Sequence, residues 1–141
     1  MKRFSRGYTT GVYDMFHIGH LNIFKNAKKY CDFLIVGVST DEVVMHAKKK
    51  KTVIPFEERS EIVASIRYVD MVVPQNDYSA EAKINYAKNN NIDVIFVGSD
   101  WKGTEKWNYI EAELAKINCS VIYLPHTDGI SSSMLREKIN K

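Results

Sequence analysis

Short runs of apolar, often β-branched residues alternate along this chain with stretches of helical periodicity, and this alternation constrains the fold more than any other feature. The apolar runs cover residues 8–13, 32–39, 71–74, 92–98 and 119–125, and the helical patterns cover residues 18–30, 56–69, 80–89, 107–117 and 132–139. Strands that alternate with helices form a parallel sheet through right-handed crossovers. The pattern therefore predicts an α/β, Rossmann-like parallel sheet of about five strands with helices on both faces.

The size and composition restrict the class of protein further. The 141 residues, of which 45% are hydrophobic, predict one domain, residues 1–141, with a packed core. A net charge of +3 gives no argument for nucleic-acid binding. No apolar run is long enough for a membrane span, and no apolar segment of a signal peptide follows the basic N-terminus. Cys31 and Cys119 form no CxxC pair, which predicts reduced thiols in a cytoplasmic protein.

The loops that follow the predicted strands should converge on one site, because ligands of parallel sheets bind beyond the carboxyl ends of the strands. These loops read GVYDMFHIGH, STDE with HAKKKKTVIPFEER, GSDWKG, and PHTDGISSSMLR. Their histidines, lysines, hydroxyls and glycines suit a polyphosphate. Neither GxGxxG nor GxxxxGK[ST] occurs, which disfavours an ordinary dinucleotide site and excludes a P-loop.

The segment His17-Ile18-Gly19-His20 lies where the first strand is expected to lead into a helix. The free backbone N–H groups of a helix start favour an anion, and Gly19 would let a phosphate approach the backbone. Two histidines three residues apart share one face and could donate Nε2–H bonds to phosphate oxygens. A pair of structural histidines is the alternative; zinc ligation is disfavoured because no third and fourth ligand have suitable spacing.

The motifs YDMFHIGH, STDE, PFEER, IRYVD, DWKG and TDGISSS occur in this order, and with them the chain resembles the small bacterial glycerol-3-phosphate cytidylyltransferases. That family belongs to the HxGH nucleotidyltransferase superfamily, and the resemblance extends from about Tyr8 to Lys138. HxGH alone is specific only for the superfamily. The ordered set is much more specific.

The resemblance implies a role for particular residues. His17, His20 and Lys50 would be catalytic. Lys48 and Lys83 would hold the acceptor's phosphate, and Arg59 and Arg67 would order the acceptor site and the contact between subunits. The nucleotide would be bound by Val12, Tyr13, Gly19, Asp100, Trp101, His126, Thr127, Gly129, Ile130, Ser131 and Ser132.

The chain departs from the family pattern in two places. His126 stands where the family has an arginine, and its loop is one residue shorter, which predicts a pH-dependent contact with the nucleotide. The stretch between Pro74 and Asn91 is longer than usual and carries Lys83, so this departure affects the part of the site that would hold the acceptor.

The resemblance implies a homodimeric cytidylyltransferase that transfers CMP from CTP to glycerol 3-phosphate and releases pyrophosphate, for precursors of teichoic acid or capsule. The acceptor phosphate is itself a nucleophile, so we expect catalysis by positioning and charge stabilisation. No carboxylate cluster suggests a metal cage, so Mg²⁺ would be held mainly by the triphosphate.

Other functions remain open. Phosphoethanolamine or another polyol phosphate could replace glycerol 3-phosphate. The ending SSSMLR resembles adenylyltransferases of the superfamily, whereas Met15 after Asp14 favours cytidylyl transfer, because many adenylyltransferases have proline there. A nucleotide sensor or an RNA binder would have lost the histidines or lysines, which are present. A class I aminoacyl-tRNA synthetase would need a much longer chain and a KMSKS loop.

Overall fold

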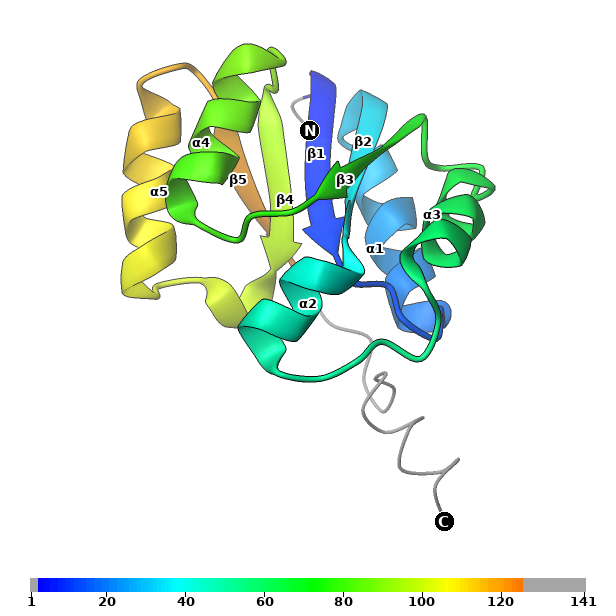
Figure 1. The fold of residues 1–141 in the computed structure, drawn as a ribbon. Coiled ribbons are helices and arrows are strands. Elements are labelled where there is room, and N and C mark those ends of the chain that lie inside the picture. Colours follow the sequence, from blue (N-terminus) through cyan, green and yellow to red (C-terminus); the bar gives the residue numbers. More distant parts are fainter. Residues whose placement is uncertain (1–2, 126–141) are drawn as a thin grey trace.

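The computed structural model describes residues 3–125, which form a five-stranded parallel sheet with helices on both faces (Figure 1). The strand order is β3-β2-β1-β4-β5, and every neighbouring pair is parallel. The strands are β1 (Phe4–Gly11), β2 (Cys31–Ser39), β3 (Met71–Gln75), β4 (Val94–Gly98) and β5 (Ser120–Leu124). The predicted Rossmann-like α/β architecture is confirmed.

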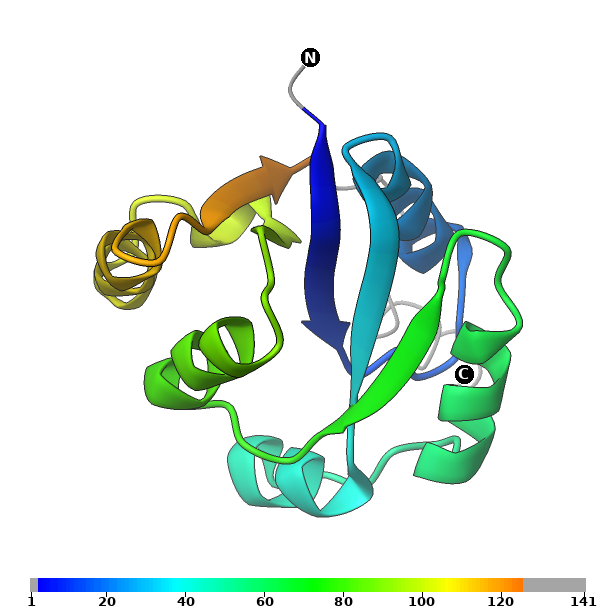
Figure 2. The ribbon, with the colours of Figure 1, turned by 90° about the horizontal axis from the view of Figure 1, so that it is seen from above.

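The helices form one layer on each side of the sheet. Helices α1 (Ile18–Lys28) and α3 (Phe56–Ala64) lie on one face, and α4 (Ala80–Asn89) and α5 (Glu105–Ala115) lie on the other (Figures 1 and 2). Helix α2 (Asp41–Lys48) lies beside the carboxyl ends of the central strands, and a 3-10 turn, η1 (Ser99–Trp101), follows β4. Within the described residues, no helix is long and apolar enough to cross a membrane.

Two hydrophobic clusters, one on each face, hold these layers together. In β2 the alternate residues Leu34, Val36 and Val38 belong to the cluster under α1 and α3, whereas Ile35 belongs to the cluster under α4 and α5. All four side chains are fully buried. A strand that is covered on both faces needs apolar residues at consecutive positions, which explains the continuous run in β2.

The boundaries of several elements differ from the prediction, and one helix was not predicted. The first strand runs from Phe4 to Gly11, whereas residues 8–13 were predicted. Helix α3 ends at Ala64 and not at residue 69, because the chain leaves the helix in turns and bends from residue 65 on. Helix α2 occupies a stretch interpreted as loop, although Thr40 is a typical N-cap residue whose Oγ1 accepts from the N–H of Val43. The predicted helix at residues 132–139 lies outside the described residues.

Candidate active site

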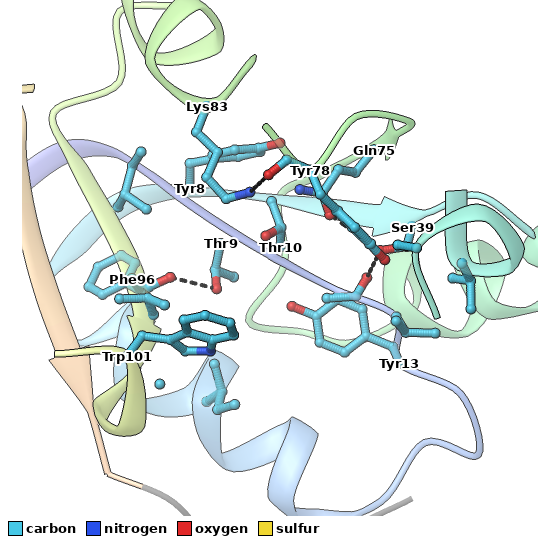
Figure 3. A pocket seen from close by; sticks show the side chains of 18 of the residues that line it. Tyr8, Thr9, Thr10, Tyr13, Ser39, Gln75, Tyr78, Lys83, Phe96 and Trp101 are labelled. Carbon is cyan, nitrogen blue, oxygen red and sulfur yellow. Dashed lines mark hydrogen bonds between the residues drawn. The ribbon is translucent and has the colours of Figure 1, made fainter. Parts of the chain in front are cut away.

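A cavity of about 620 Å³ opens at the carboxyl ends of β1 and β4. The chain leaves β1 toward β2 on one side, whereas β4 pairs with the other side of β1. Such a topological switch point leaves a crevice between the loops of the two neighbouring strands, and ligands of open α/β sheets bind there. The loop after β1, helix α2, the β3–α4 loop and the segment after β4 all line the cavity (Figure 3).

The loop after β1 leads into α1 through the two histidines of the HIGH segment. His17 is the N-cap of α1, and its Nδ1 accepts the backbone N–H of Gly19 at 3.0 Å. In return, Nδ1 of His20 accepts the backbone N–H of His17 at 3.2 Å. This is a capping box made by two histidines, a reciprocal pair of bonds that satisfies two free donors of the helix start.

These bonds determine which ring nitrogens remain for a ligand. Because each Nδ1 is an acceptor, each neutral ring carries its proton on Nε2, which is left as a donor. The rings of His17 and His20 stack with centroids 3.8 Å apart. His20 lines the cavity and packs edge-on against the ring of Tyr13.

Both histidines are neutral at neutral pH. Burial lowers the pKa of His17, and burial together with the neighbouring His17 lowers the pKa of His20 to about 4, although Asp14 acts in the opposite direction. The pair therefore offers oriented N–H donors instead of two fixed charges. Such donors suit a phosphoryl group on which negative charge develops during a reaction.

The backbone of the same loop is strained, and burial holds it in place. Tyr13 and Met15 have φ of 56° and 50°, in the left-handed region that residues with a Cβ rarely adopt. Tyr13 is 5% exposed, and a Cβ on Gly11 would come within 2.7 Å of its ring. The close packing of the Tyr13 ring on Gly11 therefore positions the side chain that supports His20.

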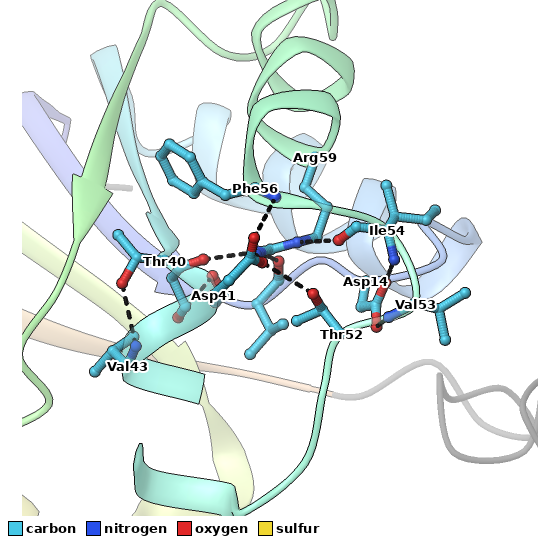
Figure 4. A network of polar contacts seen from close by, with 12 residues as sticks. Asp14, Thr40, Asp41, Val43, Thr52, Val53, Ile54, Phe56 and Arg59 are labelled. Atoms are coloured by element: carbon cyan, nitrogen blue, oxygen red, sulfur yellow. Dashed lines mark hydrogen bonds and ion pairs between the residues drawn. The ribbon is translucent and has the colours of Figure 1, made fainter. Parts of the chain in front are cut away.

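Asp14 connects this loop to the segment that follows α2. Its carboxylate is buried and accepts the backbone N–H groups of Val53, at 2.8 Å, and Ile54, at 2.9 Å (Figure 4). An aspartate in a loop before a helix commonly orders a tight turn. The structure shows a longer-range role for Asp14, since it joins segments about 40 residues apart in the sequence.

Arg59 of α3 lies behind the segments that Asp14 joins, which form part of the cavity wall, and 1% of its surface is exposed. Its guanidinium donates to the carbonyl oxygens of Ile54, Val12 and Ser39 and forms an ion pair with Asp41 at 2.6 Å (Figure 4). Burial raises the pKa of Asp41, but hydrogen bonds from Arg59, Phe56 and Thr52 outweigh it and hold that pKa below its usual range.

Lysines come to the cavity from three elements. Lys48, the last residue of α2, and Lys50 both line the cavity. Lys49 between them has a φ of 56° and reverses the direction of the chain. Lys83 enters from α4 and Lys106 from α5. A polyphosphate carries several negative charges, and α2 with the loop after it, α4 and α5 bring cations to one cavity.

Aromatic and hydroxyl side chains complete the wall. In Figure 3, Trp101 lies on one side of the cavity and Lys83 on the other. The hydroxyl of Tyr78 donates to Oγ of Ser39 at 2.7 Å, and Oγ1 of Thr9 donates to the carbonyl of Phe96 at 3.0 Å. The exposed face of Trp101, 47% accessible, is suited to stacking against a planar ring.

Seven of the residues singled out from the sequence line the cavity: Val12, Tyr13, His20, Lys48, Lys50, Lys83 and Trp101. His17, Gly19 and Asp100 are not among the lining residues; the capping box joins His17 and Gly19 to His20, and Asp100 lies in η1 beside Trp101. His126, Thr127, Gly129, Ile130, Ser131 and Ser132 lie outside the described residues.

Arg59 and Arg67 do not lie where a residue that contacts the acceptor should be. The Arg59 guanidinium is buried in the wall, so it positions the backbone and does not reach the cavity. Arg67 is exposed after α3 and lies over the ring of Tyr68. Neither lines the cavity.

Sequence reasoning missed several lining residues, among them Tyr8, Ser39, Gln75, Tyr78, Lys106 and Trp107. The spacing of hydrophobic residues carries no signal for Tyr78 or Gln75, since they meet Ser39 only through the pairing of β2 with β3. The position of Ser39 at the end of a predicted strand was a signal that could have identified it.

The family model described as "Cytidylyltransferase-like" matches residues 8–138. The chain is 39% identical to the glycerol-3-phosphate cytidylyltransferase of Bacillus subtilis (strain 168), over 93% of this chain and 94% of that protein. It is 36% identical to the enzyme of the same name from Staphylococcus aureus, over 95% and 94% of the two chains. It is also 34% identical to an FAD synthase of Thermococcus kodakarensis, over 92% and 87%.

Among solved structures, the fold is similar to that of a lipopolysaccharide core biosynthesis protein from Thermoplasma volcanium. The TM-score is 0.69 at 23% sequence identity, with 87% of this chain and 96% of the other covered. At this identity the likeness concerns the fold alone. It agrees with the Rossmann-like architecture described above.

Proposed function

The chain belongs to the cytidylyltransferase-like family, and from this membership we propose that it transfers CMP from CTP to a small phosphomonoester, glycerol 3-phosphate. The products are CDP-glycerol and pyrophosphate. The observation that carries the proposal is the 39% identity to a glycerol-3-phosphate cytidylyltransferase over 94% of that relative. The donor geometry of the histidine pair and the surrounding lysines supports it.

In the proposed reaction, a phosphate oxygen of the acceptor forms a bond to the α-phosphorus of CTP while the bond to the bridging oxygen breaks. The electron pair of that bond leaves with pyrophosphate. The acceptor phosphate is already a nucleophile, so no general base is needed. Nε2–H of His17 and His20 donate to the phosphoryl oxygens, and Lys50 neutralises charge on the nucleotide phosphates.

We propose that Mg²⁺ enters with the triphosphate as part of the substrate. Residues 3–125 contain no group of three or more His, Cys, Asp or Glu side chains placed to hold a metal ion. Mg²⁺ commonly keeps several waters and is bound by substrate phosphates with one or two carboxylates. The ion would supply charge neutralisation, while the histidines and lysines orient the phosphates.

An adenylyltransferase is the second candidate function, because the FAD synthase of Thermococcus kodakarensis is 34% identical over most of both chains. An enzyme of that kind would use ATP in place of CTP. The higher identity to the cytidylyltransferases, 36–39% for the two described above, favours CTP. Other phosphate esters, such as phosphoethanolamine or another polyol phosphate, compete with glycerol 3-phosphate as acceptor.

Pyrophosphate release tests the function directly. CTP and ATP are each mixed with the protein and glycerol 3-phosphate, phosphoethanolamine, a longer polyol phosphate or FMN, and the His20→Ala protein serves as the control. We expect release with CTP and glycerol 3-phosphate and none above the control with ATP. Release with ATP and FMN alone would instead establish the adenylyltransferase.

We further propose that residues 1–141 act as one domain in a cytoplasmic homodimer and supply precursors of teichoic acid or capsule. The exposed apolar side chains of Met71 on the edge strand β3 and Ile62 on α3 support a contact between subunits. Sedimentation of the purified protein at micromolar concentration tests the dimer. A species of monomer mass alone would refute it.

A further inference from the structure

Two lysines from neighbouring helices meet at one backbone oxygen on the cavity wall. Nζ of Lys83, in α4, donates to the carbonyl oxygen of Tyr78 at 3.4 Å, and Nζ of Lys106, in α5, donates to the same oxygen at 2.8 Å. Both lysines line the cavity. The Lys83–Tyr78 contact is visible in Figure 3.

One carbonyl oxygen does not satisfy two ammonium groups. Each has three N–H donors, and each gives one of them to Tyr78. Lys83 also lies over the Tyr78 ring, 5.9 Å from its centre. The carboxylate of Asp77, which acts on Lys83 electrostatically, accepts the backbone N–H of Ser79. Donors of both ammonium groups therefore remain for a ligand that enters the cavity.

The charges at this place are also unbalanced. Burial and the neighbouring Lys106 lower the pKa of Lys83 to about 8, with Asp77 acting in the opposite direction. Two like charges and one carboxylate leave a net positive wall. An anion between the two ammonium groups would relieve their repulsion and raise the pKa of Lys83.

Lys106 is held in place by its own helix. Thr104 is the N-cap of α5, and its Oγ1 accepts the backbone N–H of Trp107. Trp107 is 4% exposed and belongs to the hydrophobic cluster under α4 and α5. The first turn of α5 is therefore anchored on both sides of Lys106, which reduces the entropy lost when the ammonium group binds a ligand.

We propose that Lys106 binds the acceptor's phosphate together with Lys83, and that this pair selects acceptors with a dianionic phosphate. The inference rests on the function proposed above and on the resemblance, which implies that Lys83 holds the acceptor's phosphate; the structure shows Lys83 and Lys106 in the lining of the same cavity. The inference adds a ligand from α5, a helix whose predicted start at residue 107 left Lys106 in a loop. In the proposed reaction the nucleotide phosphates are held by the histidine pair and Lys50, so we assign Lys106 to the acceptor.

Steady-state kinetics at neutral pH test this role. We expect Lys106→Ala to raise KM for glycerol 3-phosphate about 10-fold, the loss typical of one charged hydrogen bond, with kcat and KM for CTP changed less than about twofold. Lys106→Arg, which keeps the charge, should retain most of the affinity. The matched control is Lys102→Ala, an exposed lysine that does not line the cavity and should leave all three constants unchanged.

The pH dependence of kcat/KM for glycerol 3-phosphate distinguishes this role of Lys106 from a purely structural one, which would leave the dependence unchanged. Lys106 lowers the pKa of Lys83, so Lys106→Ala should shift the alkaline decline of kcat/KM for glycerol 3-phosphate to higher pH. Asp77 and the Tyr78 ring, which also face Lys83, are unchanged in the variant. An alkaline limb at the same pH in both proteins would contradict the pairing.

Binding of glycerol 3-phosphate, measured by calorimetry, separates this inference from the proposed function. Equal affinities of the native and Lys106→Ala proteins would overturn the role of Lys106 and leave the cytidylyltransferase intact. Native protein that binds glycerol 3-phosphate more tightly than Lys106→Ala but forms no CDP-glycerol would support the subsite and overturn the proposed function.

Discussion

At the scale of single residues, the two motif histidines serve two purposes with different ring nitrogens. The Nδ1 atoms of His17 and His20 complete the capping box of α1, and their Nε2–H groups remain for a ligand. The structural and the phosphate-binding interpretations of the pair are therefore compatible. A substitution that keeps the cap and removes Nε2 can separate them.

His17→Asn is that substitution. Asparagine is a good N-cap residue whose side-chain oxygen can accept the N–H of Gly19, but it has no group at the position of Nε2. We expect turnover to fall about 100-fold or more, as for His17→Ala and His20→Ala, since one oriented donor is lost. The free energy of unfolding, measured in urea, should fall in His17→Ala, which loses the cap, but not in His17→Asn, which keeps it. Near-normal turnover in His17→Asn would make the pair purely structural.

Gly11→Ala tests the packing beneath this pair. The added Cβ would lie 2.7 Å from the Tyr13 ring, which is buried and cannot swing into solvent. We expect a loss of about 1–3 kcal/mol of stability from the overpacking. Turnover should also fall, because Tyr13 supports the ring of His20. A variant of native stability and turnover would show that the Tyr13 ring has room to move.

At the scale of elements, Arg59 is the connection between pieces that meet only in the folded chain. It joins α3 to the end of β2 through Ser39, to α2 through Asp41 and to the β1–α1 loop through Val12. The buried guanidinium also supplies hydrogen-bond donors to these acceptor oxygens, which would otherwise have no partner from Arg59. The cavity wall therefore depends on a residue that does not touch the cavity.

Arg59→Met should destabilise the protein by about 3 kcal/mol or more, because the carbonyl oxygens and Asp41 lose their buried partner. Arg59→Lys should lose less stability, since an ammonium group can donate to some of these oxygens but cannot reproduce all the bonds of the planar guanidinium. Urea unfolding measures both. Arg67→Ala is the control: this arginine is exposed, and its loss should change stability by less than about 0.5 kcal/mol. Equal losses at the two positions would contradict the role of Arg59.

At the scale of the whole molecule, the low pKa of His20 links the site to the stability of the fold. The folded-state pKa is about 4, whereas an unfolded chain has about 6.5. At pH above about 6.5 the ring is neutral in both states. As the pH falls from there to about 4, the unfolded state binds more protons, so the stability decreases.

His20→Gln isolates this contribution. Glutamine is a favoured residue at this position of a capping box, and it does not titrate. Over the same pH range, the native protein should lose on the order of 1–2 kcal/mol more stability than the variant, after a discount for the partial exposure of the ring. Carboxylates titrate in both proteins and cancel in the difference. Parallel pH profiles would show that His20 is protonated equally well in the folded state.

Local patterns in the sequence determined the order of strands and helices and the position of the histidine motif. The continuous apolar run of residues 32–39 predicts a strand buried on both faces, and His17 to His20 form the start of the helix that follows the first strand and its loop. Such features depend on residues a few positions apart, which is the range over which periodicity and capping operate. The parallel sheet and the edge that carries the site followed from them, whereas Lys48, Lys50 and Lys83 were implied by the resemblance of the ordered motifs to a family.

The tertiary structure alone decided which distant residues meet. The burial of Arg59, the link from Asp14 to Val53, and the meeting of Lys83 and Lys106 at the Tyr78 carbonyl join segments between 5 and 47 residues apart. Hydrophobic periodicity gives no signal for these contacts, and the resemblance to a family singled out Arg59 and Lys83 without showing which residues they meet. Their roles depend on how α3, α4 and α5 pack on the sheet. That packing results from the whole hydrophobic core, and no single segment of the sequence determines it.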